Sequence, residues 1–517
     1  MKQLKLLLSL YLLYPTAHCA KAQHWLGAAS SNYAGTNSVY ANPANVVDSR
    51  HKIYLNLAAH DFSMLTNYIT WNAPYSLMGL VTNSVEPQYR SDRGLIIFKD
   101  SYWQERLNGK PKRFHTGGDL RGPALLVSLK QNKIGVAIST RGRYFLNLTD
   151  VSEPIARLIN LGTDRPDLQN VKHTDQRATL NVNGYIETGL SVGAVIIDDQ
   201  EYFLKVGATL KRLTGMYNAH ARIEDADIEV LVERDNPQRE VIQAYNLKAS
   251  YGYTTEGSFN SFAPTPAFLF GRRAAGGGWG LDLGVVFEYR PDIKKLSFRD
   301  KKRGGLIGDV TKNKYKFKIG AALNDLGAIR YNNPAYVNQY NVDQRDVVFS
   351  YRLFNNIKGS DGAITALNRT LGVRPENKTT AFSSGLPTTL NLSFDYLWKN
   401  NLYLSAVWIQ NLRTATSLAM QQPSVLAVVP RWERKWGEVS APISLIDNYS
   451  AMTVGLAGRF GPLWVGSDNI LGTLSLLSSR GLDIFFGLSV PIFHTRTLKP
   501  LSCPVPMAQP NRRKRRF

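Results

Sequence analysis

Cysteine is nearly missing from this chain of 517 residues, which contains only Cys19 and Cys503. Since Cys19 lies in an N-terminal leader, the rest of the chain can form no internal disulfide and no cysteine-based zinc or iron–sulfur site. Long apolar runs are also missing. After the leader no stretch approaches the roughly eighteen consecutive apolar residues of a transmembrane helix. These absences exclude disulfide-stapled domains and helical membrane proteins.

Signatures of catalysis and of bound cofactors are missing as well. The histidines are scattered without H-x-x-x-H or H-E-x-x-H spacing, and no G-x-S-x-G elbow occurs. Gly276–Gly278 lacks the following helix and lysine of a phosphate loop, so we interpret it as a turn. We therefore expect no enzyme, no metal and no cofactor. A lipase or acyltransferase would need only a Ser or His near a membrane boundary, and stays a weaker alternative.

The first residues have the three parts of a secretory signal. Two lysines precede a short apolar run, and small residues then flank a cleavage position. This predicts a signal peptide at residues 1–22, cut between Ala22 and Gln23. The apolar run is too short for an uncleaved anchor. Lipidation of Cys19 is disfavoured because His18 stands where a small residue is expected.

The formal net charge is +22. Such a charge often indicates a nucleic-acid partner. However, an exported chain seldom meets nucleic acid, and no helix-turn-helix, zinc-finger or RNA-binding signature is present. We therefore expect no nucleic-acid partner, and assign the charge to a basic lumen, to contact with anionic lipid and to a basic tail.

Hydrophobicity alternates with a period of two in many segments. In residues 481–493 one face is wholly apolar and the other is small, polar or mixed. A strand between lipid and a lumen has this pattern. The same alternation recurs in Tyr202–Leu210, Leu281–Arg290, Tyr315–Leu323 and Leu390–Trp398. Many of these apolar faces end in Tyr or Trp, as at a membrane interface, which favours a transmembrane barrel over a soluble β-sandwich or propeller.

Connections alternate between tight turns and long polar stretches. Asn- and Asp-containing turns follow the runs that end near Leu129, Ile197 and Trp398. The long stretches are residues 92–120, 151–175, 224–240, 294–311 and 331–385. This asymmetry is typical of an outer-membrane barrel, with turns in the periplasm and loops outside. We predict an all-β fold: a transmembrane antiparallel β-barrel over residues 51–493, with about 14 strands and 12 or 16 as alternatives. Its last strand should pair with the first near Ile53–Leu57.

Residues 23–50 precede the first strand and show no alternation. Asn42-Pro43 resembles an N-cap followed by proline at the first helical position, so a helical turn is expected from Ala44. Aromatic and valine side chains would be unusual in a solvated leader. We therefore expect this segment to be a hatch or plug in the lumen, with a disordered leader as the alternative.

Charged side chains fall on the inward faces of the predicted strands. The basic ones predominate, and a basic lumen would favour anionic solutes or a fatty-acid carboxylate. The alternative, which we favour, is a salt-bridged network that braces the wall and the plug, because opposite charges lie at the same level. The predicted lumen charges are Arg141, Arg143, Lys205, Lys211, Asp282, Glu288, Arg290, Lys316, Lys318, Asp395 and Asp483.

The C-terminal end has two features. Val490, Ile492 and Phe493 end the last strand and are the expected signal for the barrel-assembly machinery. Residues 494–517 form a proline-containing tail with a basic cluster. In the periplasm this tail would contact anionic head groups or a partner protein, or remain solvated.

The chain resembles an uncharacterised family of Bacteroidota outer-membrane proteins, a domain of unknown function. The resemblance covers nearly the whole mature chain, through Ser31–Leu57, Gly122–Arg143, Phe203–Gly215 and three later segments. These are Trp279–Asp292, Pro423–Ser444 and Gly461–Gly472. More distantly, Asn42-Pro43-Ala44 is similar to the long-chain fatty-acid transporter superfamily, which implies a 14-stranded barrel with an N-terminal hatch. Some family members carry a C-terminal OmpA-like peptidoglycan-binding domain, but the given sequence stops soon after its last predicted strand, so that function is not carried over to it.

These observations predict a barrel of the cell outer membrane, reached by signal-peptide export. The expected function is to bind or pass small hydrophobic or amphipathic solutes through a plugged lumen. The alternative is a structural or accessory barrel for surface assembly, secretion or envelope attachment. Expected partners are outer-membrane lipid, the barrel-assembly machinery and a small hydrophobic ligand, whereas the sequence does not predict the oligomeric state.

Overall fold

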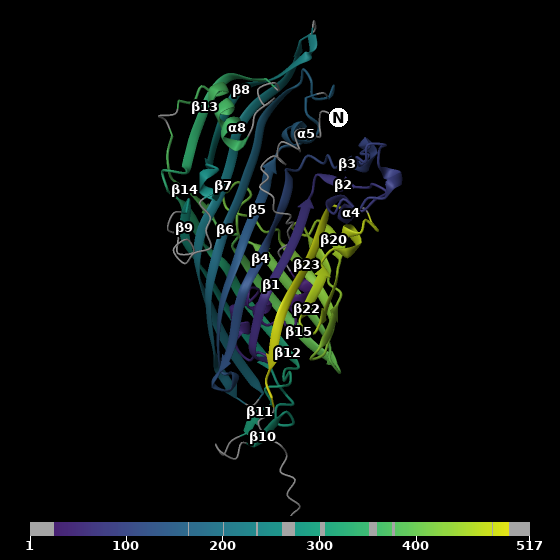
Figure 1. Ribbon diagram of the computed structural model, residues 1–517, viewed down its shortest axis with the longest axis vertical. Coiled ribbons are helices and arrows are strands. Elements are labelled where there is room, and N and C mark those ends of the chain that lie inside the picture. The colour runs from purple at the N-terminus through teal and green to yellow at the C-terminus, as the bar shows by residue number, and fades with distance from the viewer. Residues whose placement is uncertain are drawn as a thin grey trace, which may run out of the picture.

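The computed structural model describes residues 25–163, 165–199, 201–233, 236–260, 274–299, 306–350, 359–374, 378–477 and 479–495. It confirms the all-β prediction: the chain forms a closed antiparallel barrel of 14 strand positions (Figure 1). The predicted cleavage site at Ala22 and Gln23 and the tail beyond residue 495 lie outside the described residues.

Most barrel positions are filled by one unbroken strand. These are β1 (His51–Thr66), β4 (Lys112–Leu129), β5 (Ile134–Val151), β6 (Lys172–Asp199), β7 (Tyr202–Glu233), β9 (Gly276–Tyr289), β12 (Phe317–Tyr331), β16 (Leu402–Asn411), β17 (Val425–Glu433), β22 (Leu463–Ser467) and β23 (Gly481–Phe493). The other positions hold two short strands in line. These pairs are β14 (Phe382–Gly385) with β15 (Thr389–Lys399), β18 (Gly437–Ser440) with β19 (Ile443–Ile446), and β20 (Ala451–Val454) with β21 (Leu456–Phe460).

The barrel closes between its first and last strands. Ile53 lies opposite Ile492, and Leu55 opposite Val490. The predicted pairing of the last strand with Ile53–Leu57 is therefore confirmed. On its other edge β1 pairs with β4, so β1 lies between β23 and β4.

Tight connections define one end of the barrel, which we name the turn end. There β4 joins β5, β6 joins β7, and β15 joins β16. The opposite end, which we name the loop end, carries the longer connections. One prediction was wrong: residues 294–311 lie at the turn end, where β10 (Ser297–Arg299) pairs with β11 (Leu306–Gly308), because β9 runs toward that end (Figure 1).

At the loop end, β6 and β7 extend beyond the barrel. There β7 leaves β9 and pairs with β8 (Asn236–Thr254), which pairs in turn with β13 (Val337–Ser350). The stretch 224–240, expected to be a polar loop, is thus mostly strand. Because charged residues alternate along this stretch, its sequence resembles a polar loop more than a strand hairpin. Apolar side chains such as Ile228 and Leu247 form a separate core there.

The remaining elements are short. The other strands are β2 (Ile69–Trp71) and β3 (Trp103–Glu105), which pair with each other at the loop end. The helices are α2 (Leu26–Ala29), α3 (Thr36–Val39), α4 (Leu77–Val81), α5 (Glu153–Leu161), α6 (Gly257–Asn260), α8 (Gly359–Thr370) and α9 (Ile470–Thr473), with the 3₁₀ turns η1 (Pro43–Val46), η2 (Pro87–Tyr89), η3 (Asp100–Tyr102) and η4 (Lys130–Asn132). Within the described ranges, no helix has both the length and the apolar character needed to cross a membrane.

An apolar outer surface surrounds the barrel. Every barrel position contributes at least one large apolar side chain that is exposed. In order around the wall these are Leu57, Leu125, Ile138, Leu190, Leu210, Leu283, Ile319, Phe394, Leu404, Leu426, Val439, Leu456, Val465 and Phe486. Exposed apolar surface of this extent indicates contact with another apolar phase.

Candidate functional site

Residues 25–50, which we name the N-terminal segment, lie inside the barrel and are mostly buried. The segment contains α2, α3 and η1. The η1 turn begins as the sequence indicates: Asn42 is its N-cap, Pro43 its first residue, and the Asn42 Oδ1 accepts a hydrogen bond from the backbone N–H of Ala44 at 3.0 Å. The Asn42 amide also donates to the carbonyl oxygens of Val285 on β9 and Ala321 on β12.

The η1 turn packs against a row of glycines in the barrel wall. Gly135, Gly193, Gly207 and Gly284 lie directly opposite one another on the adjacent strands β5, β6, β7 and β9. A Cβ added at Gly135 would lie 2.0 Å from the carbonyl oxygen of Val46, and one at Gly207 would lie 2.5 Å from that of Pro43. The missing side chains therefore let the backbone of η1 contact the wall directly.

At its start the segment is held by the first and the last strands of the barrel. The Trp25 ring stacks on Phe485 of β23, and its Nε1 donates to Asp61 of β1. The Asp468 carboxylate, just after β22, accepts the backbone N–H groups of Leu26 at 2.8 Å and Gly27 at 3.2 Å. Such charge-assisted bonds are stronger than neutral ones.

Further polar contacts fix the middle and the end of the segment. Ser31 donates to Glu438 at 2.5 Å, and the Asn32 amide donates to Glu433 at 2.9 Å. At the turn end Asp48 forms ion pairs with Arg290 at 2.7 Å and Lys314 at 3.0 Å. The segment is thus tied to the wall along its whole length by contacts that involve no covalent bond.

Seven buried charged side chains, which we name the central ion cluster, fill the lumen between β4 and β12. Arg141 pairs with both Asp119 at 3.0 Å and Glu187 at 2.9 Å. Lys211 lies 2.6 Å from an oxygen of Asp282 and 2.6 Å from one of Asp325. Arg143 completes the cluster through Asp119 and Asp325. Every cation in the cluster is paired, so this part of the lumen offers no free positive charge.

Most other predicted lumen charges are paired too. Lys205, Glu288 and Arg290 surround the end of the N-terminal segment. Lys318 and Asp395 form a group with Arg431, which lies 2.8 Å from Asp395. Asp483 lies apart, on β23 beside Asp468.

Lys316 does not join the lumen charges. It precedes β12, and its Nζ lies over the Tyr396 ring and donates to the carbonyl oxygen of Leu397. Conversely Tyr315, expected on the apolar outer face, is buried and donates to Asp395. Both departures have one cause: the regular strand begins only at Phe317, so the two-residue period does not extend back to Tyr315.

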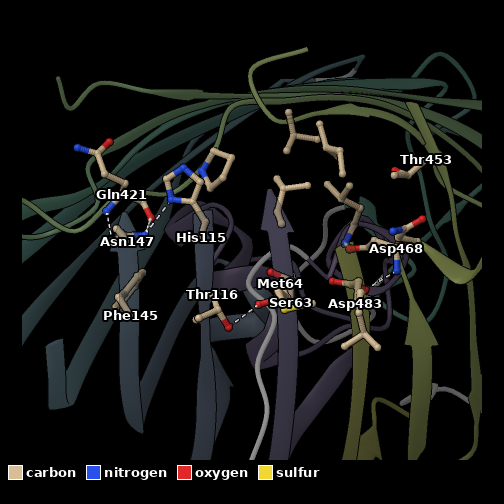
Figure 2. A pocket seen from close by; sticks show the side chains of 18 residues that line it. Ser63, Met64, His115, Thr116, Phe145, Asn147, Gln421, Thr453, Asp468 and Asp483 are labelled. Carbon is tan, nitrogen blue, oxygen red and sulfur yellow. Dashed lines mark hydrogen bonds between the residues drawn. The ribbon is translucent and has the colours of Figure 1, made fainter. Parts of the chain in front are cut away.

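Two cavities flank the N-terminal segment. One, the loop-side cavity, has an empty volume of about 640 Å³, part of it open to solvent (Figure 2). The other, the turn-side cavity, has about 1050 Å³ of such space and is lined largely by the segment with β9, β15 and β16. Leu26 lines both cavities, so α2 lies between them.

The loop-side cavity has mostly apolar walls. Its apolar lining includes Leu26, Met64, Leu65, Phe145, Pro423, Val425, Ile446 and Leu482. Polar groups gather at two sides: His115 and Asn147 lie on one, and Asp468 and Asp483 on the other (Figure 2). Sequence reasoning found only Asp483 of these four, because the others become neighbours through strand register alone.

Two further observations concern the predicted sites. Val490 and Ile492 are exposed on the outer face, whereas Phe493 packs against His51 and Trp436 at the turn end. No group of three or more His, Cys, Asp or Glu side chains within the described ranges has the arrangement of a metal site.

Several solved structures are similar to this chain. The toluene transporter TodX of Pseudomonas putida is 10% identical, with 90% of this chain and 95% of that chain covered and a TM-score of 0.37. The toluene transporter TbuX of Ralstonia pickettii is 9% identical, with 89% of this chain and 95% of that chain covered and a TM-score of 0.35. A FadL homologue of Pseudomonas aeruginosa is 10% identical, with 93% of this chain and 99% of that chain covered and a TM-score of 0.23.

No curated protein sequence matches this chain. A protein-family model described as "Family of unknown function (DUF5723)" matches residues 43–468, which is most of the chain. The matched region begins at η1 and runs through the barrel to Asp468. The chain therefore belongs to the DUF5723 family.

Proposed function

We propose that this protein is an outer-membrane channel that binds and passes small hydrophobic or amphipathic solutes, with the N-terminal segment as its hatch. One observation carries the proposal: α2 separates an apolar cavity on the loop side from a larger cavity on the turn side, and Leu26 lines both. Displacing α2 would join the two cavities into one path.

The location in a membrane rests on the outer surface. Each barrel position exposes large apolar side chains, and water would disfavour such a belt strongly. Exposed aromatic side chains lie toward the turn end, including Tyr202, Trp398 and Trp432. Tyr and Trp favour the boundary between hydrocarbon and head groups. We therefore place the turn end in the periplasm, the loop end outside, and assign export to residues 1–22.

The contacts of the hatch allow α2 to move while the rest of the hatch stays bound. At η1 it lies against the glycine row, where the wall presents no side chains. Its first turn depends on Trp25, on the two N–H bonds to Asp468 and on the bond from Ser440 Oγ to the Gly27 carbonyl oxygen. Loss of these contacts would free α2 while η1 remains bound by Asn42.

The central ion cluster limits where a solute can pass. It occupies the lumen beside β4, β5, β6, β7, β9 and β12. Moving a hydrophobic solute through these paired charges would expose them to an apolar group, which is costly. The path therefore runs beside α2 through the loop-side cavity, which is lined by residues of β1, β4, β5, β17, β19, β20 and β23.

A structural or accessory barrel is the second candidate. Two observations favour it: the central ion cluster seals much of the lumen, and β6, β7, β8 and β13 build a large extension beyond the loop end. Such an extension would suit contact with a surface partner. This candidate gives no role to the apolar cavity beside α2.

Solute entry into vesicles separates the two candidates. Purified protein is placed in vesicles whose outer leaflet contains lipopolysaccharide, and entry of an uncharged aromatic solute is measured with and without protein. A channel speeds entry, and Trp25→Ala, which loosens α2, speeds it further. Entry at the protein-free rate for both proteins would reject transport and leave the accessory role.

A further inference from the structure

The polar groups of the loop-side cavity show which solutes it accepts. We propose that it selects uncharged or cationic amphiphiles that carry a hydroxyl or amino group, and that it disfavours carboxylates. This inference rests on the proposed function and names the solute class for the same site. It depends on a hydrogen-bond acceptor, on a hydrogen-bond donor and on the absence of lysine and arginine among the residues described around the cavity.

The acceptor is Asp483 on β23. Its Oδ1 accepts the backbone N–H of Asp468 at 2.5 Å. Its Oδ2 has no hydrogen-bond or ion-pair partner among the described residues, although only 6% of the residue is exposed. The carboxylate points into the cavity (Figure 2). This oxygen borders the cavity, so a donor on a bound solute would give it a hydrogen-bond partner.

The donor is His115 on β4, and the surrounding bonds fix which ring nitrogen carries the proton. The backbone N–H of Gln421 donates to Asn147 Oδ1 at 2.8 Å, so the Asn147 amide cannot be turned around. Its Nδ2 then donates to the Gln421 carbonyl oxygen and to His115 Nδ1 at 3.0 Å. Because Nδ1 accepts, the proton of the neutral ring must lie on Nε2.

His115 Nε2 has no partner among the described residues, and the imidazole lines the cavity. His115 lies opposite Leu65 of β1, and Asp483 lies opposite Ser63 on the other edge of the same strand. His115 and Asp483 are thus separated by two inter-strand distances and by two residues along β1, so their Cα atoms lie roughly 12 Å apart.

Charge at the cavity has one sign. Among the described lining residues, Asp468 and Asp483 are acidic and none is lysine or arginine. Asp61 of β1, another buried carboxylate, accepts from Trp25 and pairs with Arg121 at 3.5 Å. A solute carboxylate would place a further acidic group beside Asp468 and Asp483, with no lysine or arginine among the described lining residues to offset it. An ammonium or hydroxyl group would instead donate to Asp483.

Three matched probes test this proposal: 4-phenylbutylamine, 4-phenylbutanol and 4-phenylbutanoate. Their binding to the protein in lipid nanodiscs is measured by titration calorimetry, with empty nanodiscs subtracted. The amine and the alcohol are expected to bind at least about tenfold more tightly than the carboxylate. Equal or tighter binding of the carboxylate overturns this inference but leaves the channel intact. Binding of none of the three would instead reject the proposed function itself.

A variant tests whether the preference for the amine arises at Asp483 in the loop-side cavity. Asp483→Asn keeps the shape and the Oδ1 acceptor, and is expected to weaken amine binding about tenfold while changing alcohol binding less than about threefold. Asp292→Asn, at an exposed carboxylate near the turn end, is the matched control and should leave all three affinities unchanged. The heat-dependent gel mobility of a folded barrel verifies both variants. Unchanged amine binding in folded Asp483→Asn would contradict the assignment.

Discussion

Trp25, near the start of the described chain, stacks on Phe485 of the last strand, with 4.7 Å between the ring centroids and 21° between the ring planes. The contact joins the N-terminal segment to the strand that closes the barrel. The Arg121 guanidinium covers the other side of the indole at 4.3 Å from the ring centroid. Seating of the hatch thus depends on a complete barrel.

Removing this ring should release α2. We expect Trp25→Ala to weaken docking of the segment by about 3–5 kcal/mol, as for other buried tryptophans, because the side chain is fully enclosed. Limited proteolysis of the segment in the folded barrel measures the effect. Trp398→Ala, at a largely exposed ring on the outer face, is the control and should leave the segment protected. Equal protection in both variants would show that the indole does not hold α2.

The glycine row makes a sharper prediction. In Gly135→Ala the new Cβ would lie 2.0 Å from a backbone oxygen of η1, so the segment must move away from the wall. We expect a loss of about 1–3 kcal/mol in docking, the usual cost of overpacking. Gly142→Ala lies on the same strand with its nearest neighbour at 4.0 Å, and should change docking little. Hydrogen exchange of the amides of residues 44–47 measures both, and similar exchange in the two variants would contradict direct backbone contact.

The central ion cluster should respond strongly to the loss of one charge. Lys211→Met leaves the Asp282 and Asp325 carboxylates buried without their nearest cation. Breaking a buried pair in this way costs about 3–5 kcal/mol. Guanidinium-induced unfolding measures the change. Lys295→Met, which removes a fully exposed partner of Asp292, should not alter the midpoint. If Lys211→Met shifted the unfolding midpoint as little as Lys295→Met does, the central ion cluster would contribute little to stability.

At the loop end, Glu153 should make one connection sensitive to pH. Burial raises the pKa of Glu153, but Lys112 and the N–H groups of Asn108 and Gly109 outweigh it, so the pKa lies below its ordinary value. The bonds to the 108–109 turn are therefore complete above the ordinary glutamate pKa and are lost as the pH falls through the lowered one. Amide protection factors at Asn108 and Gly109 should fall in acid, and at neutral pH in Glu153→Gln. Unchanged protection in Glu153→Gln would contradict the conclusion that the Glu153 carboxylate holds the 108–109 turn.

Local patterns predicted the architecture well, because strand alternation and the N-cap at Asn42 depend only on near neighbours in the sequence. The closing pair of Ile53–Leu57 with the last strand followed from the requirement that a barrel has no edge. Each of these features could be recognised without knowing which strands are adjacent.

Features that depend on register could not be predicted. Gly135, Gly193, Gly207 and Gly284 are scattered along the sequence and form a row only when four strands align. Asp325 joins the central ion cluster because β12 carries a bulge between Leu323 and Leu326. The sequence marks such a bulge only weakly, and the other missed carboxylates, Asp119 and Glu187, meet the predicted cations only through the pairing of β4, β5 and β6.

The movement of α2 is the central claim, and a reversible crosslink tests it most directly. A Cβ built at Gly27 lies 2.8 Å from Ser440 Oγ, close to the span of a disulfide. Gly27→Cys with Ser440→Cys, in a chain that also carries Cys503→Ser, should therefore lock α2 to the wall when oxidised. We predict that oxidation abolishes protein-dependent solute entry into the vesicles and that reduction restores it in the same sample. Equal entry in the locked and the reduced protein would contradict a path opened by α2.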